Sequence, residues 1–143
     1  MIVPESPSAT LERSSVAGVL SESDAVANLA VRDIKLARHF YEKTLGFEPV
    51  GHEGDELIVY RSGKTAFNVY RSDYAGTNRA TALTWAVGDR IETVVESLRA
   101  KGIAFEHYDM AGMRREGDLH LAGDMKVAWF KDPDGNILNV VSG

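Results

Sequence analysis

The apolar and polar positions of the chain follow the same order twice. Residues 26–50 and 82–106 each begin with a short β-type run, continue with apolar residues at helical spacing and reach a glycine at the end of that spacing. Equivalent positions of the two segments, such as Asp33 and Asp89, lie 56 residues apart without a gap. We interpret the two segments as copies of one structural unit.

Each copy predicts one helix with defined ends. Asp33 and Asp89 are expected to cap the first turns through their side chains. Gly46 and Gly102 are expected to end the helices, because glycine adopts the left-handed conformation found there. The residues predicted to face the core are Ile34, Ala37, Phe40, Tyr41 and Leu45 in the first copy and Ile91, Val94, Val95 and Leu98 in the second.

Two β-type runs around a turn follow each helix. Residues 57–71 contain the turn Ser-Gly-Lys, and residues 126–141 contain Asp-Pro-Asp-Gly. Residues 107–125 are interpreted as a longer loop, either a lid or a solvated connector. The predicted fold class is α+β, with two tandem βαβββ modules (25–72 and 80–142) that form a curved mixed sheet with a concave ligand cavity.

Length and composition fit one globular domain, residues 25–143, after an N-terminal tail. Residues 1–24 are rich in Ser, Glu and Ala, and we expect them to be flexible. The net charge of −5 argues against a nucleic-acid partner. We expect no membrane partner, because no apolar stretch approaches the length of a span. The absence of cysteine excludes thiol chemistry and fits a cytoplasmic location.

The segments "LAVRDIKLARHFYEKTLGF" and "WFKDPDGNILNVV" resemble the vicinal oxygen chelate superfamily, which includes glyoxalase I, extradiol dioxygenases, and fosfomycin and bleomycin resistance proteins. The resemblance implies a small-molecule ligand and a homodimer whose subunits complete each other's cavities. It also implies a divalent metal, held at the positions of Val26, Asn68, Ala82 and Asn139. Val and Ala offer no donor atom, and two neutral amides are a poor metal site. We therefore expect no metal and no other cofactor.

Without a metal, polar side chains on the inward strand faces are expected to contact the ligand. An alternative for Asn68 and Asn139 is that the two amides bond each other. Trp85 is expected in the core beneath a helix, and Trp129 either in the core or at the pocket rim. The predicted ligand-binding residues are Asn28, Asn68, Tyr70, Thr84, Trp129 and Asn139.

The predicted function is metal-independent binding of a small molecule, such as the sequestration of an antibiotic or metabolite. One alternative is a lyase or dioxygenase whose displaced metal is held by His107 and His120, near Asp109 and Asp118, and a metal-free isomerase is another. A third hypothesis is a module that serves only interaction. The sequence contains no nucleophile elbow, phosphate loop or dinucleotide fingerprint, so it identifies no catalytic residue and leaves open whether the protein is an enzyme.

Overall fold

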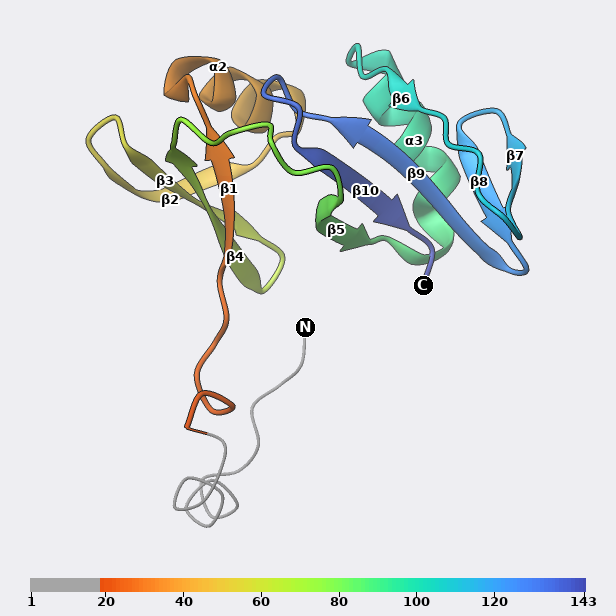
Figure 1. Cartoon of the computed structure of the whole chain (residues 1–143), viewed down its shortest axis with the longest axis horizontal. Coiled ribbons are helices and arrows are strands. Elements are labelled where there is room, and N and C mark those ends of the chain that lie inside the picture. Colours follow the sequence, from red (N-terminus) through yellow and green to blue (C-terminus); the bar gives the residue numbers. More distant parts are fainter. Residues whose placement is uncertain (1–18) are drawn as a thin grey trace.

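The computed structural model describes residues 19–143, which form two βαβββ-like modules (Figure 1). The α+β class and the tandem modules are thereby confirmed. Residues 1–18 of the predicted tail lie outside the described residues, so its flexibility stays a prediction. The first module contains β1 (Ala27–Val31), α2 (Ile34–Arg38), the π-helical segment η1 (His39–Thr44), β2 (Glu48–Glu53), β3 (Leu57–Ser62) and β4 (Thr65–Arg71).

The second module has two short strands more than the first. Within residues 19–143, no helix is both long enough and apolar enough to cross a membrane. The elements of the second module are β5 (Thr81–Ala86), the 3-10 turn η2 (Gly88–Arg90), α3 (Ile91–Ala100), β6 (Phe105–Glu106), β7 (Arg114–Glu116), β8 (Leu119–Ala122), β9 (Met125–Lys131) and β10 (Ile137–Val141).

Each module builds its own mixed sheet. The strand orders are β1-β4-β3-β2 and β5-β10-β9-β8-β7, with β6 paired to β9. In each sheet the first strand of the module pairs in parallel with the last, and the other pairs are antiparallel. The single curved sheet expected from the repeat is therefore two sheets, because β1 and β5 are each the end strand of a sheet and do not pair with each other.

The helix ends agree with the predicted pattern at three of four positions. The Asp33 carboxylate accepts hydrogen bonds from the N–H groups of Lys35 (2.9 Å) and Leu36 (3.2 Å), so it caps α2 as predicted. Gly46 and Gly102 have φ angles of 82° and 93°, as expected at helix ends. The prediction for Asp89 is wrong, because a 3-10 turn precedes α3 and places Asp89 inside that turn, where its side chain caps nothing.

The sequence pattern indicated one long loop over residues 107–125, and this prediction is wrong. They contain β7 and β8, which form an antiparallel hairpin, and β8 pairs onward with β9. The sequence pattern does not predict the hairpin, because β7 consists of the exposed charged residues Arg114, Arg115 and Glu116. Such a strand shows no apolar alternation.

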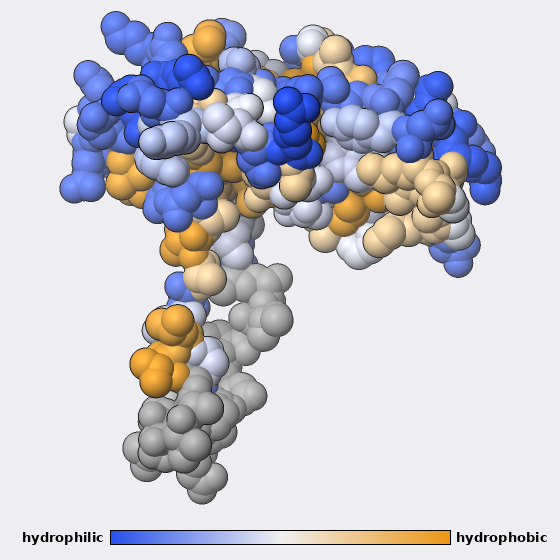
Figure 2. Space-filling model, in the orientation of Figure 1, coloured by the Kyte–Doolittle hydropathy of each residue, from blue (hydrophilic) through white to orange (hydrophobic). Residues whose placement is uncertain are grey.

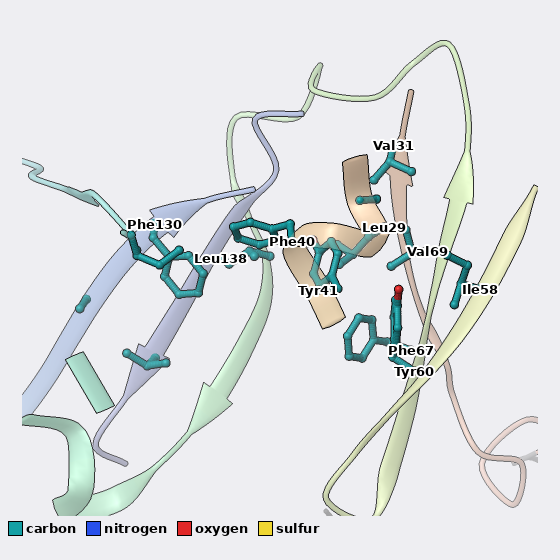
Figure 3. Packing of buried hydrophobic residues seen from close by; sticks show 14 of the residues in the cluster. Leu29, Val31, Phe40, Tyr41, Ile58, Tyr60, Phe67, Val69, Phe130 and Leu138 are labelled. Carbon is teal, nitrogen blue, oxygen red and sulfur yellow. The ribbon is translucent and has the colours of Figure 1, made fainter. Parts of the chain in front are cut away.

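The core lies between the helices and the two sheets, and aromatic rings join the modules. Figure 3 shows Phe40 between the core residues of the first module and Phe130 and Leu138 of the second. Trp85 stacks on Phe47 (5.5 Å between ring centroids) and on Phe130 (6.4 Å). Its Nε1 donates to Ser62 Oγ (3.0 Å). Trp85 thus packs against the core, as its position on β5 predicted.

The turn between β9 and β10 ties the modules together through a buried carboxylate. Asp132 is 5% exposed and accepts bonds from the Tyr41 hydroxyl (2.7 Å) and from Asn136 Nδ2 (2.8 Å) through Oδ2. Its Oδ1 accepts from the N–H groups of Asp134 and Asn136 (both 2.9 Å). Asn136 Nδ2 also donates to the carbonyl of Ala30 on β1 (2.8 Å). The turn is therefore bonded to η1 and β1 of the first module.

The linker between the modules passes close against the same turn. Asp134 Oδ1 accepts from the N–H of Arg32 (3.1 Å), and the Arg32 guanidinium donates to the carbonyl of Ala75 (3.1 Å). Gly76 has a φ of 77°, and a Cβ there would lie 2.3 Å from the carbonyl oxygen of Asp134. Only glycine therefore fits where the linker crosses the turn.

We predict that Tyr41→Phe destabilises the protein by about 1–3 kcal/mol, because it leaves one buried oxygen of Asp132 short of a donor. Burial raises the pKa of Tyr41, and the Asp132 carboxylate raises it further, so the hydroxyl stays a donor. Urea unfolding measures the change in the free energy of unfolding. Tyr74→Phe is the control, because Tyr74 is 80% exposed. Equal effects of the two substitutions would contradict a structural role of the Tyr41 hydroxyl.

Candidate functional site

The sheet of the second module has one face against α3, and we call the other face the open face because none of the described helices covers it, although the residues at its centre are buried. Leu138 and Val140 of β10 point into the core, so Asn139 between them lies on the open face. Figure 1 shows α3 behind this sheet, so the open face is toward the viewer. Asn139 lies opposite Trp129 on β9 and Thr84 on β5. Alternation along the strands predicted a common face for Thr84 and Asn139 but left the side of Trp129 open.

The six predicted ligand-binding residues fall into two groups on different sheets. Asn28, Asn68 and Tyr70 lie on the first sheet, and Thr84, Trp129 and Asn139 lie on the second. Among the described residues, no hydrogen bond or aromatic ring contact joins the two groups. Whether these residues bind a ligand stays a prediction.

The two asparagines of the repeat have different environments. Asn68 Nδ2 donates to Asn28 Oδ1 (3.1 Å), so the expected alternative of an Asn68–Asn139 bond is wrong. The reason is register, because Asn28 lies directly opposite Asn68 in the parallel pair of β1 and β4. Asn139 is 7% exposed, and its Oδ1 has no hydrogen-bond partner among the described residues.

Aromatic side chains surround the centre of the open face in the second module. Trp129, 8% exposed, meets Tyr108 edge-to-face (5.3 Å between centroids) and His120 likewise (4.9 Å). Its Nε1 donates to Thr81 Oγ1 (3.0 Å). Tyr108 follows β6 by two residues, and His120 lies on β8. We call Tyr108, His120, Trp129 and Asn139 the Trp129 cluster.

Hydrogen bonding determines which nitrogen of the neutral His120 ring carries the proton. His120 is 1% exposed, and its Nε2 accepts from the backbone N–H of Tyr108 (2.9 Å). The neutral ring therefore carries its proton on Nδ1. Nδ1 is buried and has no partner among the described residues. His120 thus offers an N–H donor, and in this geometry it has no free nitrogen to act as a base.

Two donors and one acceptor in the Trp129 cluster are unpaired. The Tyr108 hydroxyl is buried without a partner among the described residues, like His120 Nδ1 and Asn139 Oδ1. Burial raises the pKa of Tyr108 and the Glu106 carboxylate adds to the shift, so the phenol stays protonated at neutral pH. A buried polar group without a partner costs about 1–3 kcal/mol. A bound molecule that supplies the missing partners would remove that cost.

The residues at the four family metal positions do not fit a divalent cation. Val26 and Ala82 have no donor atom. The amide oxygens of Asn68 and Asn139 are left, on different sheets, and two neutral oxygens are a poor site for a divalent ion. Within residues 19–143, no three His, Cys, Asp or Glu side chains gather as a metal site would require.

The alternative site at His107 and His120 fits a metal no better. The rings lie 6.4 Å apart between centroids, and His120 Nε2 is taken by a backbone N–H. His107 Nε2 contacts Asp118 Oδ1 (2.8 Å), and Arg99 Nη2 pairs with Asp118 Oδ2 (2.6 Å). His107 and Arg99 hold the pKa of Asp118 below its usual range. These side chains form an ion-pair network and leave no open set of ligands.

The position of Tyr108 and His120 beside Trp129 was not predicted from the sequence. Both were treated as parts of a loop, and His120 only as a metal candidate. The useful signal was the alternation Leu119-His120-Leu121, which is typical of a short strand. With β8 recognised, register places His120 opposite Val127, on the same face as Trp129.

Solved structures show the same arrangement of two modules at low sequence identity. A bleomycin-binding protein in complex with bleomycin is 17% identical (TM-score 0.63), covering 85% of this chain and 98% of that one. A lactoylglutathione lyase from Agrobacterium tumefaciens is 16% identical (TM-score 0.62; 83% and 92% covered). An integron cassette protein from the mobile metagenome of the Halifax Harbour sewage outfall is 15% identical (TM-score 0.62; 84% and 99% covered). These likenesses show the fold alone.

A comparison of the sequence with models of protein families identifies the family. The model of the Glyoxalase/Bleomycin resistance protein/Dioxygenase superfamily matches residues 24–140, and the chain belongs to this superfamily. No curated protein matches the chain significantly. Because one fold hosts many activities, the ligand has to be argued from the site.

We predict that His120 carries its proton on Nδ1 when neutral. Long-range ¹H–¹⁵N NMR at about pH 8, above the usual histidine pKa, distinguishes the two tautomers. His39 is the internal control, because it is exposed and free to exchange between tautomers. A proton on Nε2 of His120 would show that the bond from the Tyr108 N–H is not formed and that Nδ1 offers no donor.

Proposed function

We propose that this protein binds a small, partly apolar molecule on the open face of its second module, without a metal ion. The observation that carries the proposal is the set of three unpaired buried atoms around Trp129: Tyr108 Oη, His120 Nδ1 and Asn139 Oδ1. The ligand would accept hydrogen bonds from Tyr108 and His120 and donate one to Asn139. Its apolar part would pack on the indole of Trp129.

Binding suits this site better than catalysis. The neutral His120 has its Nε2 bonded and its Nδ1 protonated, and the Tyr108 phenol stays protonated, so the cluster holds no ready base. The bleomycin-binding protein of the same fold supports a binding role in which a toxic or regulatory molecule is sequestered. We propose a cytoplasmic location because the chain contains no cysteine.

We also propose a homodimer in which the first module of one copy faces the second module of the other. This arrangement would bring both predicted groups of ligand-binding residues into one cavity. Figure 2 shows apolar residues gathered along the underside of the two modules. Val26 and Tyr70 are exposed by 47% and 37%, and their burial in a dimer would be favourable.

We predict a dimer by light scattering coupled to size-exclusion chromatography. The expected mass is twice the 15.6 kDa of one chain. Tyr70→Arg should shift the protein toward the monomer, because it places a charge within the proposed interface. Leu36→Arg is the control, because Leu36 is 51% exposed on α2, on the opposite side of the first sheet. A monomer at all concentrations of the unchanged protein would refute the dimer.

We predict that Asn139→Leu abolishes ligand binding without loss of stability. A thermal-shift screen with antibiotics, including bleomycin, and metabolites should find a compound that stabilises the unchanged protein. A ligand at one hundred times its Kd adds about 2.7 kcal/mol to the free energy of unfolding. Asn139→Leu should remove this shift, and it should raise the stability of the free protein because a buried oxygen without a partner among the described residues is lost.

The matched control is Asn68→Leu at the equivalent position of the repeat. It should lower the stability of the free protein, because the Asn68 amide is bonded. A chelator such as EDTA should leave the thermal shift unchanged. A shift that requires added Zn²⁺, Ni²⁺, Mn²⁺ or Fe²⁺ would overturn the metal-independent proposal, and the lack of any shift would favour a module that serves only interaction.

A further inference from the structure

A polar groove of about 680 Å³ lies at the end of the open face, where the linker passes β9 and β10. Two cationic side chains, Arg79 and Lys131, line it. None of the described residues that line it carries a carboxylate. The other main lining side chains are Thr77, Asn78, Tyr108 and Ile137. In a chain with a net charge of −5, this is a local concentration of positive charge.

The linker that carries Arg79 is held in place on both sides. Gly76 packs against the carbonyl of Asp134, as described above. Asn78 Nδ2 donates to the carbonyl of Ala80 (3.1 Å), and Asn78 Oδ1 accepts from its N–H (3.2 Å). Arg79 lies between these two residues. The linker contacts the second module at Gly76, against the Asp134 carbonyl, and again at Thr81, which pairs with Ile137 of β10, and Arg79 lies between these two points.

Arg79 and Lys131 differ in whether another side chain already pairs with them. Arg79 forms no hydrogen bond or ion pair with any described residue. Lys131 Nζ lies 3.6 Å from Glu106 Oε1, and its side chain is 46% exposed, so this pairing is loose. A guanidinium presents paired N–H groups that match a carboxylate or a phosphate. Arg79 is thus the cation that an anionic group in the groove would meet first.

The groove is continuous with the Trp129 cluster. Tyr108 belongs to both, since its ring contacts Trp129 and also lines the groove. Lys131 and Ile137 pair in register and are the next residues on the open face after Trp129 and Asn139. Such neighbours along a strand lie about 7 Å apart. A molecule in the groove would therefore lie beside the Trp129 cluster, with Tyr108 as a wall of both.

The chemical class of the ligand can be inferred if the proposed binding function holds. We infer that the ligand is a small organic acid whose apolar body lies against Trp129 and whose carboxylate or phosphate lies in the groove at Arg79 and Lys131. The acidic group supplies the counter-charge that Arg79 lacks among the described residues. The body of the ligand supplies the partners that the Trp129 cluster lacks.

Three naphthalene probes separate the effect of the ligand's charge from the binding of its apolar body. Calorimetric titrations would compare 1-naphthoate and 1-naphthyl phosphate with the neutral 1-naphthamide. We expect at least one of the anions to bind about tenfold more tightly than the amide, and this preference to shrink as NaCl rises from about 0.1 M to about 0.5 M. Arg79→Gln should remove the preference and leave amide binding unchanged. Arg79→Lys should restore part of it, and Arg90→Gln, which changes an exposed arginine on η2, should have no effect.

The outcomes separate this inference from the proposed function. Equal binding of acid and amide, both abolished by Asn139→Leu, would overturn the acid inference and support the binding face. Loss of amide binding in Arg79→Gln would also overturn it, because Arg79 would then act on the shape of the site. If no naphthalene probe binds, the acid inference fails, whereas the wider ligand screen decides the proposed function independently.

Discussion

A single buried carboxylate determines how the two modules sit together. Asp132 lies in a turn of the second module, yet one of its oxygens receives the hydroxyl of Tyr41 from the first. Its other oxygen receives two backbone N–H groups of its own turn, which gives the turn a fixed shape. Asn136 then reaches the carbonyl of Ala30. Because a charged group buried with one partner missing is costly, docking of the modules stabilises the turn.

The position of the candidate site follows from this docking. The linker crosses the turn at Gly76, and this crossing places Arg79 beside the last residues of β9 and the first of β10. The same two strands carry Trp129 and Asn139 a little further along. The junction that joins the modules and the groove that adjoins the open face are thus built from one turn. The structural role and the proposed binding role lie within a few residues of each other.

Much of the fold could be predicted because its signals are local and occur twice. The cap at Asp33, the positive φ of Gly46 and Gly102 and the turn at Gly135 are each set by neighbours in the sequence. The failures have a different origin. Asp89 has the right residue type but lies within a 3-10 turn, and β7 consists of charged residues without alternation. In both cases tertiary context outweighed local propensity.

The candidate site was predicted in part for the same reason. Alternation placed Thr84 and Asn139 on one face, and pairing with β9 added Trp129. Alternation could not show that the Asn68 amide bonds to Asn28 while the Asn139 oxygen has no partner among the described residues. That difference depends on Asn28, which lies opposite Asn68 on the neighbouring strand. Tyr108 and His120 reach Trp129 through β6 and β8, whose short lengths leave little pattern to detect. The polar atoms that define the site were therefore the hardest to anticipate.

The places of the two tryptophans give the protein two separate optical reporters. Trp85 lies between the modules, on Phe47 and Phe130, so its fluorescence should report their separation during unfolding. Trp129 lies on the open face with the edge of its ring toward Thr81, so its emission should respond to an occupant of that face. Since the chain contains no other tryptophan, docking of the modules and occupancy of the site can be followed in the unlabelled protein by replacing one indole at a time.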